Sequence, residues 1–207
     1  MCSSDLGGRV QSLFTDVLNG YRVAVKPSRI GRLERIPGVK AVHIIPRATR
    51  SLANAIPYTG TGQTWGRVGV TGAGVKIAII DSGINYYHKD FDGAGYAAWQ
   101  ADDGLSAGPD FPTAKVTKGY DFAGDSYTGD NEPTPDDDPL DCKDRDSEIG
   151  QHGTHVAGIA AGVGVTRSND AYAGPYSQSA IDAADLAIAP GFAPQATLFA
   201  YRIFGCS

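Results

Sequence analysis

The segment that most constrains the fold is a polar turn, QHGTH at residues 151–155, which runs directly into a helix of small residues. From Val156 the chain continues with Ala, Gly, Ile, Ala, Ala and Gly, and a helix this thin lets other elements approach closely. His152 stands at the start of this helix. An imidazole held there can gain and lose a proton near neutral pH, so the segment predicts a general base.

A buried strand upstream offers this base a partner. Residues 77–80, IAII, are apolar without alternation, which predicts a strand buried on both faces, as in a parallel sheet. Asp81 follows at the carboxyl end, where open α/β sheets place their ligand crevice. A carboxylate there can accept the Nδ1 proton of His152, and we expect the two groups to lie about 2.6–3.2 Å apart.

At these residues the chain resembles a known family. Asp81-Ser82-Gly83 after an apolar strand, and HGTHVAG from His152, look like the aspartate and histidine motifs of the subtilisin-like serine proteases, peptidase family S8. Residues 191–204 resemble the turn and core strand that follow the histidine helix in that family. The resemblance covers roughly residues 73–207. It implies an α/β, parallel-sheet catalytic domain, an Asp–His–Ser triad containing Asp81 and His152, and polypeptide substrates.

The third triad member is not found in the sequence. In the family the nucleophile lies in a Gly-Thr-Ser motif that opens a later helix, and no such motif occurs here. The asparagine that donates to the oxyanion is also expected later, and Ser207 follows the wrong residues to substitute for the nucleophile. We therefore expect an incomplete catalytic domain that does not hydrolyse peptides by itself. The alternative is a non-catalytic binding or inhibitory module derived from a protease.

The amino-terminal part of the chain differs in charge from the rest. Residues 1–50 contain nine Lys/Arg and three Asp/Glu, whereas residues 51–207 contain nine Lys/Arg and twenty Asp/Glu. Oppositely charged segments can dock on each other, although each can equally be a solvated surface. Within the basic part, residues 21–25 and 39–45 are predicted strands and residues 28–36 a short helix.

The basic part is similar to the end of the inhibitory propeptide that precedes subtilisin-like catalytic domains; the likeness rests on NGY at residues 19–21 and LERIPGV at residues 33–39. It implies that residues 9–50 pack on the catalytic domain as its own propeptide; a generic ferredoxin-like interaction module is the alternative. We expect residues 1–8 to be a non-native start. Residues 51–72, rich in Gly, Thr, Ala and Pro, are predicted to be a linker containing the maturation site.

An acidic segment separates the aspartate from the histidine. Residues 121–148 contain eleven Asp/Glu, and three prolines prevent regular structure. Clustered oxygens can hold Ca²⁺, but no EF-hand spacing is present, so we favour a solvated acidic loop. We expect that no cofactor is required and that structural calcium is an option, because the family often uses calcium to stabilise loops.

Two cysteines flank the predicted site. A bridge between Cys142 and Cys206 would tie the acidic loop to the sheet edge in an oxidising compartment, and closing a loop of about 65 residues stabilises by roughly 2–4 kcal/mol. Two unpaired cysteines are the alternative. The family resemblance implies a secreted protein.

Several other interpretations are excluded or left open. A zinc site at His152 and His155 is a rival interpretation that a metal assay would decide, but the zincin pattern needs a glutamate after the first histidine and a spacing of four. We assign no metal ligand and expect His155 to be a buried, hydrogen-bonded helix residue. Residues 163–190 resemble an insertion without assigned chemistry, and Trp65 is expected to pack against the catalytic body. We expect no nucleic-acid partner and no membrane span, and substrate-binding residues stay unassigned.

Overall fold

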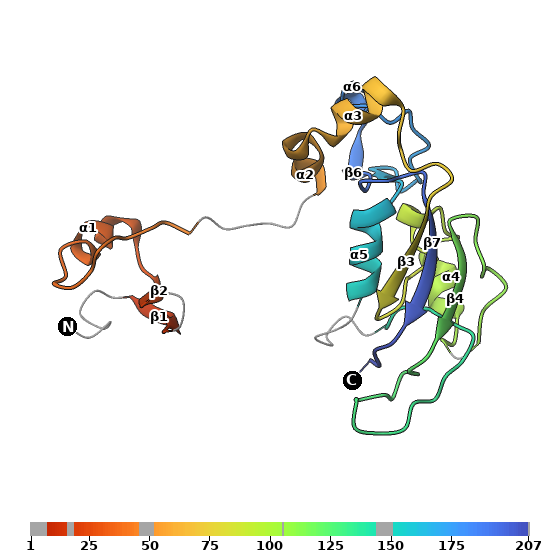
Figure 1. Ribbon diagram of the computed structural model, residues 1–207, viewed down its shortest axis with the longest axis horizontal. Helices are drawn as coiled ribbons and strands as arrows, with labels where there is room; N and C mark the ends of the chain where they lie inside the picture. The colour runs from red at the N-terminus through yellow and green to blue at the C-terminus, as the bar shows by residue number, and fades with distance from the viewer. Residues whose placement is uncertain (1–7, 16–18, 46–51, 105, 144–150, 207) are drawn as a thin grey trace. The chain divides into compact units, whose positions relative to one another are not determined.

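The computed structural model describes residues 8–15, 19–45, 52–104, 106–143 and 151–206. The chain forms two compact units, Met1–Thr49 and Arg50–Ser207 (Figure 1). Most of residues 1–8, together with residues 46–51, lie outside the described residues, so the non-native start and the maturation site stay predictions. Within the described residues, no helix has the length and apolar character needed to cross a bilayer.

The first unit is a small antiparallel hairpin followed by a short helical segment. Its elements are β1 (Arg9–Phe14), β2 (Gly20–Ala24), η2 (Pro27–Arg29) and α1 (Ile30–Leu33). The predicted strand at residues 21–25 is present as β2, and the predicted helix is present but shorter. Residues 39–45 do not form a strand. Their β propensity is not enough, because a strand also needs a pairing partner, and no described residue pairs with them.

The second unit is built on a parallel sheet in the order β3-β7-β4 (Figure 1), with β3 at Lys76–Asp81, β4 at Val116–Asp121 and β7 at Thr197–Arg202. Asp81 and Asp121 both lie opposite Arg202, so the three carboxyl ends meet at one edge of the sheet. The predicted α/β parallel-sheet architecture is therefore confirmed.

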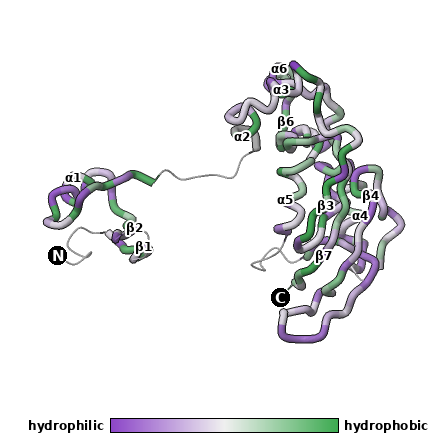
Figure 2. The backbone as a smooth tube through the Cα atoms, viewed as in Figure 1, coloured by the Kyte–Doolittle hydropathy of each residue, from purple (hydrophilic) through white to green (hydrophobic). Residues whose placement is uncertain are grey.

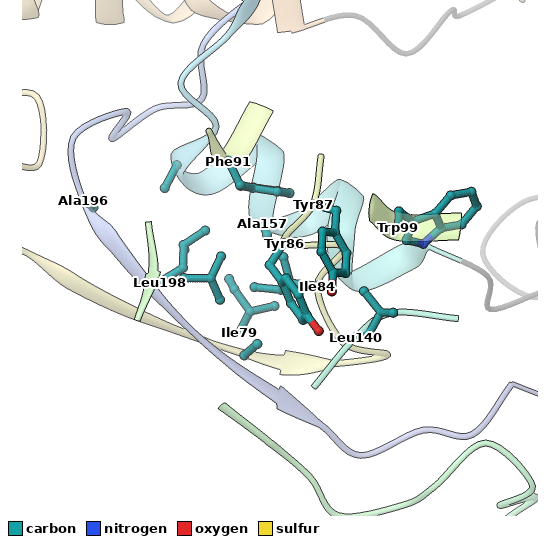
Figure 3. Packing of buried hydrophobic residues seen from close by; sticks show 13 residues of the cluster. Ile79, Ile84, Tyr86, Tyr87, Phe91, Trp99, Leu140, Ala157, Ala196 and Leu198 are labelled. Atoms are coloured by element: carbon teal, nitrogen blue, oxygen red, sulfur yellow. The ribbon is translucent and has the colours of Figure 1, made fainter. Parts of the chain in front are cut away.

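The sheet carries its core on the side of α5. The remaining elements of this unit are α2 (Leu52–Thr59), α3 (Thr61–Val68), η3 (Lys89–Phe91), α4 (Tyr96–Ala101), α5 (His152–Ala161), β5 (Val165–Thr166), α6 (Gln178–Ala183) and β6 (Leu186–Ile188). Figure 1 shows α5 running alongside β3. Ile79 and Leu198 of the sheet pack in one buried cluster with Ala157 of α5 (Figure 3). The small side chains of α5 permit this close packing, and each large apolar side chain buried here contributes about 1.5–3 kcal/mol.

Residues 51–72 are not an irregular linker. They contain α2 and α3, and α3 is anchored by Trp65, which is 3% exposed. The indole Nε1–H of Trp65 donates to the Phe192 carbonyl at 3.1 Å, and its ring meets that of Tyr176 edge to face. Trp65 thus packs on the rest of the second unit, as expected. The glycines and Pro57 suggested a loop, but burial of the indole outweighs them.

The insertion at residues 163–190 packs on α3. Its helix α6 begins after Ser177, whose hydroxyl accepts from the Ala180 amide. α3 and α6 approach so closely that a Cβ on Gly62 would lie 2.6 Å from the side-chain oxygen of Gln178. The insertion therefore braces the segment that precedes the sheet.

The acidic segment is only partly solvated, although Figure 2 shows the loop after β4 as largely hydrophilic. Asp121, Asp138 and Asp141 are buried, which contradicts a purely solvated loop. The reason is that these three carboxylates find partners inside the fold; for example, Asp121 pairs with the buried guanidinium of Arg202 at 3.2 Å. Part of the segment (Asp144, Asp146 and Glu148) lies outside the described residues. Within the described part of the chain, no group of three His, Cys, Asp or Glu side chains is arranged to hold a metal ion.

Candidate active site

The structure brings the predicted aspartate and histidine together. Asp81 ends β3 and His152 begins α5. His152 Nδ1 and Asp81 Oδ1 are 2.7 Å apart, which is hydrogen-bonding distance. The imidazole side chain is 63% exposed and the carboxylate 14%. The pair therefore joins a sheltered carboxylate to a ring that an incoming group can reach.

Two glycines make this approach possible. A Cβ on Gly153 would lie 2.2 Å from the Gly83 carbonyl oxygen and 3.1 Å from the Asp81 Cβ. Gly83 itself has a φ of 106°, a value that L side chains rarely adopt. The missing side chain of Gly153 lets the start of α5 sit directly against the end of β3, and a Cβ on Gly83 would meet the backbone of residues 139–141 at 2.7–2.9 Å.

A second carboxylate, Asp141, lies behind the pair and is almost fully buried. It accepts hydrogen bonds from the hydroxyls of Ser82 and Thr154, at 2.8 and 2.5 Å. Burial raises the pKa of Asp141, and the hydrogen bonds from Thr154 and Ser82 oppose that rise. The sequence analysis missed this group, because Asp141 is one of eleven acidic residues in a segment interpreted as solvated.

His155 is exposed on α5, so the prediction that it is buried is wrong. The buried face of the helix contains Gly153 and Ala157. His155 is two residues from each of them, which corresponds to a rotation of about 200° around the helix axis, so it points to the other side of the helix.

The two predicted cysteines lie near the carboxyl edge of the sheet, where Asp81 is also found. Cys142 and Cys206 form a disulfide, with their Cα atoms 5.5 Å apart. The bond joins the residue next to Asp141 to the chain that follows β7. It thereby ties the acidic segment to the carboxyl edge of the sheet.

Comparison with known proteins agrees with this fold. Residues 72–207 match Peptidase S8, the subtilase family. The match covers well over half of the chain, and the chain therefore belongs to the subtilase family. The resemblance that the aspartate and histidine motifs indicated is confirmed.

The curated relatives are proteases. The chain is 28% identical to the minor extracellular protease Vpr of Bacillus subtilis (strain 168), over 96% of this chain and 20% of that protein. It is 30% identical to the PII-type proteinase of Lactococcus lactis subsp. cremoris, over 91% of this chain and 9% of that protein. It is 26% identical to the extracellular serine proteinase of Thermus sp. (strain Rt41A), over 75% of this chain and 31% of that protein. The chain thus spans about a fifth or less of the first relatives' length.

Proposed function

We propose that this chain is part of a serine endopeptidase of the subtilisin type, with His152 as general base and Asp81 as its orienting carboxylate. The observation that carries the proposal is the 2.7 Å contact between Nδ1 and Oδ1 in a member of the subtilase family. A hydrogen bond at Nδ1 fixes the tautomer and leaves Nε2 free to accept a proton. The exposed ring gives a substrate room to approach.

In the proposed reaction, Nε2 of His152 takes the proton of the serine hydroxyl as that oxygen attacks the peptide carbonyl. The same nitrogen then gives the proton to the leaving amine, and water hydrolyses the acyl-enzyme by the same route. Asp81 stabilises the imidazolium in both steps.

We propose that the nucleophilic serine and the oxyanion asparagine belong to a part of the parent protein that follows residue 207. The support is that the 207 residues contain no Gly-Thr-Ser motif and that the relatives are several-fold longer. The 207-residue chain by itself is then inactive as a peptidase.

The test is to express the full open reading frame and to measure hydrolysis of a fluorogenic peptide and labelling by a serine-directed fluorophosphonate. Replacing His152 by Ala or Asp81 by Asn is expected to lower kcat by about 10⁴- to 10⁶-fold. Asp130→Asn, which neutralises an exposed carboxylate, is the matched control and should leave kcat unchanged. A stop codon directly after residue 207, or full activity in the His152 variant, would contradict the proposal and favour a binding or inhibitory module.

The remaining parts of the proposal concern the context of the enzyme. We propose that residues 9–50 act as inhibitory propeptide, supported by their excess of basic residues over a strongly acidic remainder. The corresponding peptide should slow hydrolysis by the mature enzyme, and a scrambled peptide should not. Secretion is supported by the disulfide and by relatives that are extracellular by name. Structural calcium in the acidic segment would appear as a Tm that falls when EDTA is added.

A further inference from the structure

The amino-terminal end of α5 is capped by residues that lie outside the turn preceding the helix. The first amides of a helix have no partner within the helix and usually bond to the residue just before it. Here that residue, Gln151, has a φ of 62° and makes no capping hydrogen bond with its side chain. Instead, the Gly153 amide donates to Ser82 Oγ and the Thr154 amide to Asp141 Oδ2, both at 2.9 Å.

Asp141 is the centre of this arrangement. Its Oδ2 also accepts from the hydroxyl of Thr154 at 2.5 Å. Its Oδ1 accepts from the hydroxyl of Ser82 at 2.8 Å and from the Cys142 amide at 2.9 Å. Four donors therefore converge on one carboxylate that is 2% exposed. An ionised carboxylate has acceptor sites on both oxygens and no donor, whereas an amide in its place would direct a donor at other donors.

The donors come from both sides of the catalytic pair. Ser82 directly follows Asp81 at the end of β3, and Thr154 lies two residues after His152 in α5. The hydroxyl of Thr154 also accepts from the Asn85 amide at 2.9 Å, which adds a second link to the chain after β3. One side chain from a third segment thus joins the two segments whose ends must meet.

We propose that Asp141 is a positioning residue that sets the separation of Asp81 and His152. The inference rests on the proposed function of that pair. Asp141 does not contact the reacting atoms; it holds the end of β3 and the first turn of α5 at the distance that the 2.7 Å hydrogen bond requires. A misplacement of about 1 Å in such a pair lowers the rate by about 100-fold, so the expected effect of losing the clamp is on kcat.

The test uses NMR on the 207-residue chain, which needs no peptidase activity. The low-field Nδ1–H resonance of His152 reports its hydrogen bond to Asp81, and amide exchange reports the cap of α5. Asp141→Asn should weaken or abolish the resonance and make the Thr154 amide exchange about 10-fold faster, the size of one lost hydrogen bond. Asp130→Asn, an exposed position in the same segment with the same change of charge, should alter neither.

A second pair of variants leaves the charge of the protein unaltered. It also provides a test if Asp141→Asn does not fold. Thr154→Val keeps the shape but deletes the hydroxyl, and Thr154→Ser restores it. We expect the valine variant to lose the resonance and the serine variant to keep it. In the complete enzyme, the valine variant should lower kcat by roughly 10- to 100-fold with little change in KM.

The outcomes separate this inference from the proposed function. If folded Asp141→Asn, or Thr154→Val, keeps the resonance of the unsubstituted chain, Asp141 does not position the pair and the inference is wrong. If the unsubstituted chain itself lacks the resonance, the hydrogen-bonded pair is absent and the proposed function fails together with its positioning residue.

Discussion

Asp90 and Asp138 are carboxyl groups that the fold buries, at 4% and 0% exposure. Burial raises the pKa of Asp90 to about 6, against the opposing effects of the Gly164 amide and of Lys115. Burial raises the pKa of Asp138 to about 7, although the hydroxyl of Tyr86 donates to it. One oxygen of Asp138 has no hydrogen-bond partner. Both groups are therefore better accommodated when they carry a proton.

We predict that the second unit is more stable at pH 5 than at pH 7.5. Unfolded carboxyl groups release their protons near pH 4, whereas folded Asp90 and Asp138 hold theirs to about pH 6 and 7. Between these values the folded state binds more protons, so the free energy of unfolding falls as the pH rises. For Asp90 alone, the shift corresponds to about 3 kcal/mol over the whole titration, of which about 1.4 kcal/mol is lost between pH 5 and 7.5.

Urea unfolding at a series of pH values measures this dependence. Asp138→Asn should flatten the decline between pH 5 and 7.5, because the amide does not titrate there. Asp130 is exposed, so Asp130→Asn should leave the pH dependence of the free energy of unfolding unchanged. A free energy of unfolding that rises with pH across this window would contradict the assignment.

At the scale of elements, the contact between β3 and α5 depends on Gly153. Replacing it by Ala places a Cβ 2.2 Å from the Gly83 carbonyl oxygen, so α5 must move away from the sheet. We expect a loss of about 1–3 kcal/mol in the free energy of unfolding, typical of overpacking, measured by chemical denaturation. Gly66→Ala is the control, because its Cβ would meet its nearest atom at 3.5 Å in ordinary contact. The idea fails if both alanine variants are equally stable.

The attachment of α3 depends on Trp65. Trp65→Phe removes the hydrogen bond to Phe192 and should lower the free energy of unfolding by about 1–2 kcal/mol; Trp65→Ala should lower it by about 3–5 kcal/mol. Tyr58→Ala, at an aromatic residue of α2 that is 92% exposed, should have almost no effect. Thermal unfolding followed by circular dichroism would compare the three, and equal Tm values would show that α3 is not held by the indole.

The sequence was informative where the deciding interactions are local. The apolar run of β3 predicts the strand and the place of Asp81, and the small residues after His152 predict a helix that can lie against it. The prediction that this strand is buried on both faces is wrong: Ile79 is 6% exposed but Ile80 is 62% exposed, because the described sheet packs its core against one face of β3. α3 could not be predicted in this way. Its glycines at positions 60 and 69 cap the helix in left-handed conformations but read as loop signals, and its stability comes from Trp65 and distant residues.

The contacts around Asp141 escaped prediction for a similar reason. Ser82 lies 59 residues from Asp141, and no periodicity in the sequence connects them. A hydrogen bond over that distance along the chain depends on the tertiary fold alone. Likewise, residues 39–45 have the composition of a strand, but pairing decides whether they become one.

At the scale of the whole molecule, the Cys142–Cys206 bond restrains the second unit. Its partners are separated by 64 residues, and closing a loop of this length stabilises a folded protein by about 2–4 kcal/mol. We expect Cys206→Ser to lower the free energy of unfolding by that amount in urea titrations. Cys2→Ser, which leaves the bond intact, is the matched control. Equal stability of the two variants, or no effect of reductant on the unsubstituted chain, would contradict the prediction.

The same bond determines what happens after a cut in the backbone. If a protease nicks the chain anywhere between residues 143 and 205, the two pieces remain covalently attached through Cys142 and Cys206. Such a nicked molecule is heavier only by the one water added on hydrolysis, and it separates into two bands on a denaturing gel only after reduction. Preparations that look intact without reductant can therefore contain internally cleaved protein.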